Sequence, residues 1–211
     1  MAKHPAPGRV KTRLAATLGR ARACALYEAF LLDLAERLER APYDVTWVYW
    51  PPGAPFRTLL PGRDCRPQRG VDLGARMARA LGEVLTEGVG SAIVLGVDAP
   101  HVPLARLDEA AAQLGIGVDL VVGPAADGGY YLLGMRTLHP KLFAGIPWGT
   151  ASVLNLTLAR AHQLGLRTHL LAEEFDIDEA VDVTRLEGLL REGRVYLPRT
   201  AAVLAQSTDR A

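Results

Sequence analysis

The chain has 211 residues, of which 49% are hydrophobic and 22% are charged; this composition is typical of one globular domain and excludes a disordered chain. The 24 basic and 23 acidic residues give a net charge of +1, which argues against a nucleic-acid-binding protein driven by phosphate neutralisation. We expect no membrane span and no signal peptide, because no apolar run reaches the roughly 18 residues that a span needs. Cys24 and Cys65 are too few for a disulfide framework and lack metal-ligand spacing, so we expect reduced thiols in a cytoplasmic protein.

Helix-like and strand-like segments alternate along the chain. Apolar residues recur at helical spacing over 21–40 and predict a strong amphipathic helix. The β-branched and aromatic run at 44–50 predicts a strand. The later expectations, in chain order, are a surface connection over 51–67, a helix over 72–87, a strand over 92–97, a helix over 104–114, strands over 119–123 and 129–136, a helix over 150–164, a strand over 167–172, a helix over 179–191 and a partly helical tail over 197–211. This alternation predicts an α/β domain on a mostly parallel sheet.

The first candidate site is the loop PAPGRVKTRL, with Lys3 just before it. Two prolines and Gly8 favour a fixed turn whose N–H groups can face an anion. The basic side chains that follow are two residues apart and can project the same way from an extended backbone: Arg9, Lys11 and Arg13. Such cations suit a polyphosphate, although a solvated basic loop is the alternative. A parallel sheet normally carries a strand before such a loop, and we expect this first strand to be missing from a chain whose true start lies upstream.

Asp98 directly follows the apolar run over 92–97. Ligands of α/β proteins bind at the carboxyl ends of strands, and a carboxylate there can hold Mg²⁺ or Mn²⁺ together with substrate phosphates. The alternative is a turn or capping role before Pro100. His101, in the same proline-rich turn, is expected to be structural.

Asp127, Gly128 and Gly129 form a strong turn signal. A hairpin turn alone would explain it, and the functional alternative is a place where a ligand approaches the backbone closely. Tyr130 and Tyr131, which follow, should point to opposite faces of a strand.

An acidic segment near the end of the chain reads FDIDEAVD. Asp176 and Asp178 are two residues apart on an extended stretch, so one of them could join Asp98 on a metal. The alternative is acidic capping of the helix over 179–191, with Asp182 at its start, which the helix dipole favours.

Two weaker signals lie elsewhere in the sequence. Asp72 is expected to cap a helix, with Arg76 about one turn later. Trp148, in a loop of proline and glycine, could stack on a ligand or pack in the core.

Together these motifs resemble a family of small GT-A-fold transferases long known only as a domain of unknown function. Some of its members are named as arsenosugar-biosynthesis or radical-SAM/selenodomain-associated glycosyltransferases. The matching blocks are KHPAPGRVKTRL, QRGVDLGARM, GVDAPHVP, GPAADGGYYLLG, IPWGT and DIDEAVD, and they span nearly the whole chain. A more distant similarity runs to phospholactate guanylyltransferase and to the molybdopterin nucleotidyltransferases.

The resemblance implies a three-layer α/β/α sandwich of the GT-A type, formed as a single domain over 1–211. Its nucleotide-binding half would cover about 1–103, its acceptor half about 104–195, and a tail would follow over 197–211. Mapped onto matching positions, the nucleotide would be bound by Lys3, Gly8, Arg9, Lys11, Arg13, Asp72 and Arg76, the acceptor by Asp127, Gly128, Gly129 and Trp148, and a divalent metal (Mg²⁺ or Mn²⁺) by Asp98 and Asp178, with Asp176 as the other option. Asp98, Asp127 and Lys11 would be the catalytic residues, with Asp127 orienting the acceptor or taking its proton.

The leading functional hypothesis is a metal-dependent glycosyltransferase that uses a nucleotide-sugar and a small-molecule acceptor. A nucleotidyltransferase, which would transfer a nucleoside monophosphate from a triphosphate and release pyrophosphate, is the second. A non-catalytic nucleotide-binding protein is the third. We expect neither a nucleic-acid partner nor a membrane partner, and the sequence leaves the oligomeric state open, a homodimer included.

Overall fold

The computed structural model describes residues 1–206, and the chain divides into two compact units. The first unit comprises Met1–Pro67, Val97–Val102 and the C-terminal part from Ile177. The second comprises Gln68–Gly96 and Pro103–Asp176. The proposed nucleotide and acceptor halves, divided near residue 103, stay a prediction. Within the described residues, every helix is too short or too polar to cross a membrane.

The sheet of the first unit is entirely parallel. Its strands are β1 (Ala2–Lys3), β2 (Thr46–Trp50) and β3 (Asp64–Pro67), in that spatial order. Two expectations are corrected here. The first strand is present, although only two residues long, and pairs with Tyr49 and Trp50. The connection over 51–67 ends in a strand, which its prolines had concealed.

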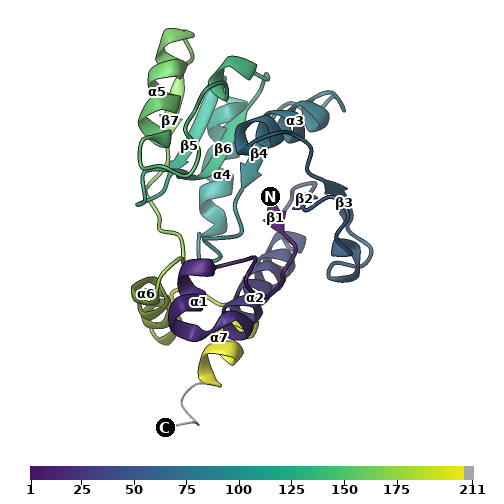
Figure 1. The fold of residues 1–211 in the computed structure, drawn as a ribbon. Coiled ribbons are helices and arrows are strands. Elements are labelled where there is room, and N and C mark those ends of the chain that lie inside the picture. Colours follow the sequence, from purple (N-terminus) through teal and green to yellow (C-terminus); the bar gives the residue numbers. More distant parts are fainter. Residues whose placement is uncertain (207–211) are drawn as a thin grey trace. The chain divides into compact units, whose positions relative to one another are not determined.

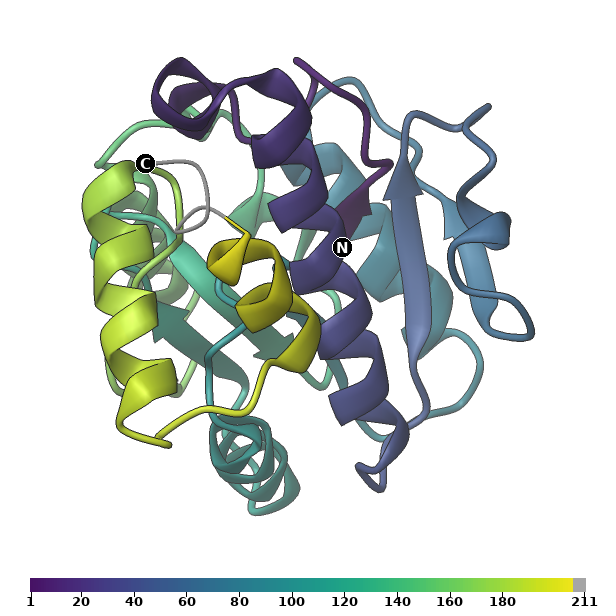
Figure 2. The ribbon, with the colours of Figure 1, turned by 90° about the horizontal axis from the view of Figure 1, so that it is seen from below.

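Up to residue 206, the helices of the first unit are α1 (Thr12–Leu18), α2 (Arg20–Glu39), α6 (Ala180–Arg191) and α7 (Pro198–Ala205). A 3₁₀ turn, η1 (Phe56–Thr58), lies between β2 and β3. Helix α2 is the centre of the unit, because α1 and α7 both pack against it (Figures 1 and 2). Its apolar stripe is buried as the periodicity predicts, and each fully buried leucine or phenylalanine contributes about 1.5–3 kcal/mol.

The sheet of the second unit contains β4 (Ala92–Leu95), β5 (Leu120–Pro124), β6 (Tyr130–Met135) and β7 (Thr168–Leu170), in the order β4-β6-β5-β7. β5 and β7 are parallel, but β6 runs antiparallel to both of its neighbours. The reason is local, since the short turn between β5 and β6 can only connect antiparallel strands. The expectation of a mostly parallel sheet therefore holds for the first unit and fails at β6.

The helices of the second unit are α3 (Leu73–Leu85), α4 (Leu104–Gly115) and α5 (Val153–Gln163), with a 3₁₀ turn η2 (Pro140–Leu142). α3 contacts β4, α4 contacts β5 and β6, and α5 contacts η2 (Figure 1). The central strand β5 is buried along its whole length. The predicted α/β alternation is thus confirmed over this part of the chain.

Candidate functional site

The basic loop of the first unit ends at Lys11, which has an uncommon conformation. Its backbone φ of 45° and ψ of 50° place it in the left-handed region, and it is the N-cap residue of α1. Outside glycine this conformation costs about 1–2 kcal/mol. Its neighbours Val10 and Leu14 are buried and anchor the loop on both sides. Backbone strain of this kind is found most often at functional sites.

The Lys11 side chain is buried, with only 2% of its surface exposed, and its ammonium lies between two carboxylates. Nζ forms an ion pair with Oδ1 of Asp98, and it donates a hydrogen bond of 3.0 Å to Oδ1 of Asp178. Nζ also lies 5.9 Å from the centre of the Phe30 ring, within the range of a cation–π contact. The structure thus brings together three residues that lie in three distant parts of the sequence.

Electrostatics within this triad favour the charged forms of Lys11 and Asp98. Burial by itself lowers the pKa of Lys11, but the charges of Asp98 and Asp178 and their hydrogen bonds outweigh it and raise that pKa above its ordinary value. Burial alone raises the pKa of Asp98, and the charge and hydrogen bond of Lys11, with smaller contributions from Lys3 and the amino terminus, lower it overall. The lysine is therefore an ammonium and Asp98 a carboxylate at neutral pH.

The backbone around Asp98 is held from two directions. Its flanking residues Val97 and Ala99 are buried, and its carbonyl accepts a hydrogen bond of 2.9 Å from the N–H of Ile177. Arg37 on α2 donates to the carbonyls of Pro100 and Val102, the second at 2.7 Å. The carboxylate consequently stands on a fixed turn, with 51% of its side chain exposed.

Asp178 is held by the start of α6. The Oδ2 atom of Asp182 accepts from the N–H of Asp178 at 3.0 Å and from the N–H of Glu179 at 2.8 Å. Glu179 and Asp182 form a reciprocal capping box. Both readings of the acidic segment therefore apply, but to different residues: Asp182 caps the helix, and Asp178 faces Lys11. Asp176 belongs to the second unit.

The other basic residues of the loop do not share the environment of Lys11. Lys3, Arg9 and Arg13 are exposed. The loop turns at Gly8, whose φ is 76°, and α1 begins at Thr12. The expectation that the cations at 9, 11 and 13 project alike from an extended backbone is therefore wrong, because the chain enters a helix within that stretch.

The donor chemistry around Lys11 suits a divalent metal. Asp98 and Asp178 already direct carboxylate oxygens at one cation, and both side chains remain 41–51% exposed. Among residues 1–206, no cluster of three or more histidine, cysteine or acidic side chains could hold a metal by itself. Mg²⁺ often takes only one or two carboxylates and completes its shell with water and substrate phosphates, so a two-carboxylate site fits this ion.

In the second unit, Asp72 and Arg76 organise the start of α3. Oδ1 of Asp72 accepts from the N–H of Ala75 at 2.7 Å, which confirms the expected N-cap. Nε of Arg76 donates to the carbonyl of Gly70 at 3.1 Å. Their contact with a nucleotide stays a prediction.

Trp148 packs on the same helix. A Cβ atom at Gly74 would lie 2.4 Å from Cζ2 of Trp148, so the indole occupies the space that a side chain there would fill. Tyr130 meets the indole edge to face, with ring centres 6.5 Å apart. Of the two alternatives for Trp148, the structure thus shows packing, and a contact with an acceptor stays a prediction.

Asp127, Gly128 and Gly129 form the turn between β5 and β6. Oδ1 of Asp127 accepts from the N–H of Gly129 at 2.8 Å. Gly128 has a φ of 87°, and a Cβ there would lie 2.2 Å from the carbonyl oxygen of Ala151. The predicted hairpin turn is confirmed. The Asp127 carboxylate is exposed, and its contact with an acceptor stays a prediction.

Sequence reasoning missed three residues, of which two support the site and one holds α7. Phe30 lies beneath the ammonium of Lys11, Arg37 holds the turn after Asp98, and Asp33 is buried and accepts from the N–H groups of Arg199 and Thr200. The signal that could have found two of them was present, since Asp33 and Arg37 continue the helical spacing of the apolar residues Leu26 and Phe30 and so fall on the same face of the helix.

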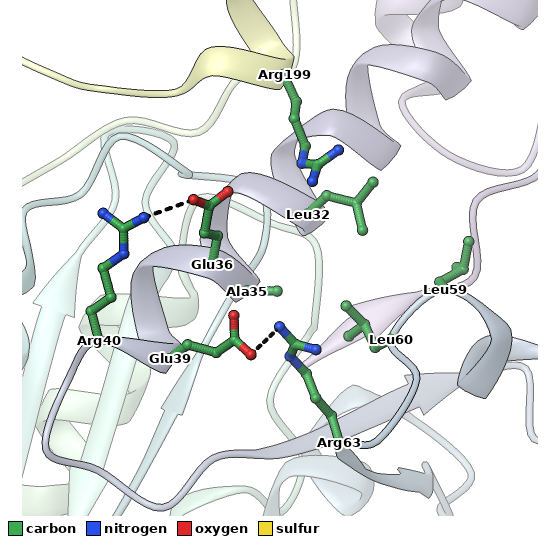
Figure 3. A pocket seen from close by; sticks show the side chains of 9 residues that line it. All are labelled: Leu32, Ala35, Glu36, Glu39, Arg40, Leu59, Leu60, Arg63 and Arg199. Carbon is green, nitrogen blue, oxygen red and sulfur yellow. Dashed lines mark hydrogen bonds and ion pairs between the residues drawn. The ribbon is translucent and has the colours of Figure 1, made fainter.

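A pocket of about 520 Å³ lies elsewhere in the first unit, between α2 and the segment after η1 (Figure 3). Its floor includes Leu32 and Leu60, and its rim carries the ion pairs Arg40–Glu36 and Arg63–Glu39. None of the residues that the sequence predicts for the site lines it.

Comparisons with solved structures place the fold. A candidate nucleotide-diphospho-sugar transferase from Desulfovibrio desulfuricans G20 is 33% identical, with a TM-score of 0.88 over 98% of this chain and 92% of that one. A 4-diphosphocytidyl-2C-methyl-D-erythritol synthase is 16% identical, with a TM-score of 0.54 over 78% and 90%. A CMP:2-keto-3-deoxy-manno-octonic acid synthetase complexed with CTP is 10% identical, with a TM-score of 0.53 over 91% and 97%. The last two show likeness of fold alone. No curated protein matches the chain.

The fold expected from the motifs, that of nucleotide-diphospho-sugar transferases, is thereby confirmed. A family model matches residues 34–150, more than half of the chain. The family suggested by the motifs is confirmed with it: the chain belongs to DUF2064, described as an uncharacterised protein conserved in bacteria.

Proposed function

We propose that this chain is a metal-dependent glycosyltransferase, which moves a sugar from a nucleotide-sugar to a small-molecule acceptor. The observation that carries the proposal is the buried, left-handed Lys11 held between Asp98 and Asp178. A strained, buried ammonium facing two half-exposed carboxylates is costly, and such arrangements concentrate at functional sites. The 33% identity over 98% of the chain to a candidate nucleotide-diphospho-sugar transferase supports the same class.

The residues of the first unit would bind the donor. Arg9 and Arg13, both exposed, would grip phosphate oxygens, because a guanidinium binds an oxyanion bidentately. Lys11 would add a compact positive charge where the leaving diphosphate develops negative charge. Asp98 and Asp178 would hold Mg²⁺ or Mn²⁺, which supplies Lewis-acid stabilisation of the leaving phosphate when it is bound.

The acceptor role falls, in this proposal, to the turn between β5 and β6 and to Trp148. Asp127 would orient an acceptor hydroxyl or accept its proton as the new bond forms. Gly129 would let the acceptor approach the backbone of this turn, whereas the space at Gly128 is taken by the carbonyl of Ala151. Trp148 would offer an apolar surface.

The test is a thermal-shift screen of nucleoside triphosphates and nucleotide-sugars, with and without Mn²⁺, followed by turnover of whichever compound binds. Selective binding raises the melting temperature by mass action. We expect Asp98→Ala to abolish the metal-dependent shift and to lower turnover by about 100-fold or more, because it removes a direct metal ligand. Arg9→Ala and Arg13→Ala should each lower turnover by a smaller factor, since other cations would remain bound to the same phosphates. Unchanged turnover in Asp98→Ala would overturn the assignment.

A nucleotidyltransferase is the second candidate, because two solved structures with this fold are synthases of cytidylyl compounds. The product distinguishes the two reactions. Release of a nucleoside diphosphate from a nucleotide-sugar supports the glycosyltransferase, and release of pyrophosphate from a triphosphate supports the alternative. Metal-dependent binding without turnover of any donor would instead indicate a nucleotide-binding protein.

A further inference from the structure

We propose that Lys11 is an internal competitor of the divalent metal, so that the metal binds well only when a nucleotide's phosphates draw the ammonium away. The inference rests on the proposed function and describes how its site is regulated. Its basis is that the Lys11 ammonium already occupies the position at which Asp98 and Asp178 converge.

The carboxylates of Asp98 and Asp178 both contact the Nζ atom of Lys11. Nζ pairs with Asp98 Oδ1 and Asp178 Oδ1 at once, and the Lys11 side chain is 98% buried, whereas the carboxylates are half exposed. A hydrated ion can therefore reach the carboxylates from solvent, but not their shared centre. A divalent ion there would meet a like charge within a few ångströms, which disfavours binding.

The surroundings of Lys11 favour the position of the ammonium between the two carboxylates until another anion binds it. Lys11 is fixed between the buried Val10 and Leu14 in its left-handed conformation, and Phe30 lies beneath Nζ. The lysine therefore cannot simply withdraw into water when a metal arrives. It needs another anion, and a polyphosphate bound by Arg9 of the loop and Arg13 at the start of α1 would supply one.

The same polyphosphate would also complete the metal's shell. The protein offers two carboxylates, and Mg²⁺ or Mn²⁺ takes further oxygens from phosphates. One event would thus move Lys11 onto the phosphates and open the space between Asp98 and Asp178. Metal alone should bind weakly, and metal with nucleotide should bind well.

The experiment measures Mn²⁺ binding to the full chain without nucleotide, by isothermal titration calorimetry and by the loss of the free-ion EPR signal. Lys11→Met should bind Mn²⁺ about tenfold more tightly than wild type, in the usual range of coupling between sites. Lys141→Met is the matched control, because Lys141 is an exposed lysine of η2 in the second unit, and it should leave the affinity unchanged. The double variant Lys11→Met/Asp178→Asn should lose the gain, since one carboxylate has gone.

If Lys11→Met binds Mn²⁺ no more tightly than wild type, the inference is wrong. If wild type still binds Mn²⁺ with nucleotide in an Asp98-dependent manner, the proposed function survives that failure. If Lys11→Met gains affinity for Mn²⁺ but no nucleotide binds or reacts, the inference stands and the proposed function fails. Should Lys11→Met not fold, because two carboxylates then face each other unpaired, Lys11→Gln replaces it in the same measurement, since its amide is neutral and can donate hydrogen bonds.

Discussion

At the scale of single residues, Lys11 lowers the stability of the fold in two ways that another residue at this position would avoid. The left-handed backbone would be cheaper with glycine or asparagine, and the buried ammonium needs two carboxylates to compensate its desolvation. A residue chosen only to start α1 would be neither strained nor charged. We therefore infer that the role of this position depends on the lysine side chain and not on the start of the helix.

Gly74 is the residue on which the placement of Trp148 depends. Gly74→Ala puts a methyl group where the indole lies, since that Cβ would be 2.4 Å from Cζ2. We expect the indole to move, with a loss of about 1–3 kcal/mol in the free energy of unfolding, as for other overpacked sites. Urea unfolding measures the loss, and the tryptophan fluorescence spectrum of the folded protein reports the displacement.

Gly115→Ala is the matched control, because Gly115 ends α4 and has nothing within 4 Å of the added carbon. It should change neither the spectrum nor the stability appreciably. If Gly74→Ala also leaves the fluorescence of the folded protein unchanged, Trp148 is not seated on α3 as described.

At the scale of elements, long periodic segments were predictable and short ones were not. Helix α2 was expected over 21–40 and runs over Arg20–Glu39, because twenty residues of apolar periodicity determine it. β1 has two residues, and β3 lies at the end of a proline-rich stretch. Elements of that length owe their existence to pairing with β2, which local sequence does not record.

The candidate site shows the same division. The basic loop motif identified Lys11 as a residue of interest. Asp98 was identified because it directly follows a predicted strand, and Asp178 because it precedes a predicted helix. The sequence could not show that α1 begins at Thr12, so it aligned Lys11 with Arg9 and Arg13 instead of separating them. Nor could it show that Arg37, on α2, holds the turn that carries Asp98, because such contacts depend on tertiary packing.

Helix α7 depends on a carboxylate from α2. Asp33 is 1% exposed and accepts from the N–H groups of Arg199 and Thr200 at 3.0 and 2.8 Å, in the first turn of α7. Asp33→Ala leaves these donors buried without their acceptor and removes a charge that the helix dipole favours. We expect a loss of about 2–3 kcal/mol in urea unfolding.

Asp44→Ala serves as the comparison for that measurement, because Asp44 is an exposed acidic residue before β2. Its effect should stay within about 0.5 kcal/mol, as for most surface positions. An equal effect of the two substitutions would mean that Asp33 does not cap α7.

At the scale of the whole chain, the first unit is assembled from segments that the second unit interrupts. Lys11 comes from Met1–Pro67, Asp98 from Val97–Val102 and Asp178 from the segment that begins at Ile177. Each contributes one member of the triad, so none of the three segments contains the site by itself. The short segment 97–102 is held by its own buried residues and by Arg37 on α2.

That segment also carries a group that makes the stability of the chain depend on pH. His101 is 3% exposed, and its pKa is lowered to about 4 by burial first and then by the charges of Arg185 and Arg37. The unfolded chain takes up this proton near pH 6.5. Between pH 6.5 and 4 the unfolded state therefore binds more protons, and the free energy of unfolding falls as the pH falls, by about 3 kcal/mol over the whole window.

Urea unfolding at intervals between pH 7 and 5 isolates this effect, because most carboxylates titrate below that range. Wild type should lose stability steadily below pH 6.5, and His101→Gln should flatten the slope whatever its stability at pH 7, since glutamine does not titrate. His162→Gln, at an exposed histidine of α5, should keep the slope of wild type. An undiminished slope in His101→Gln would show that the proton enters elsewhere and that His101 is not held neutral by its burial.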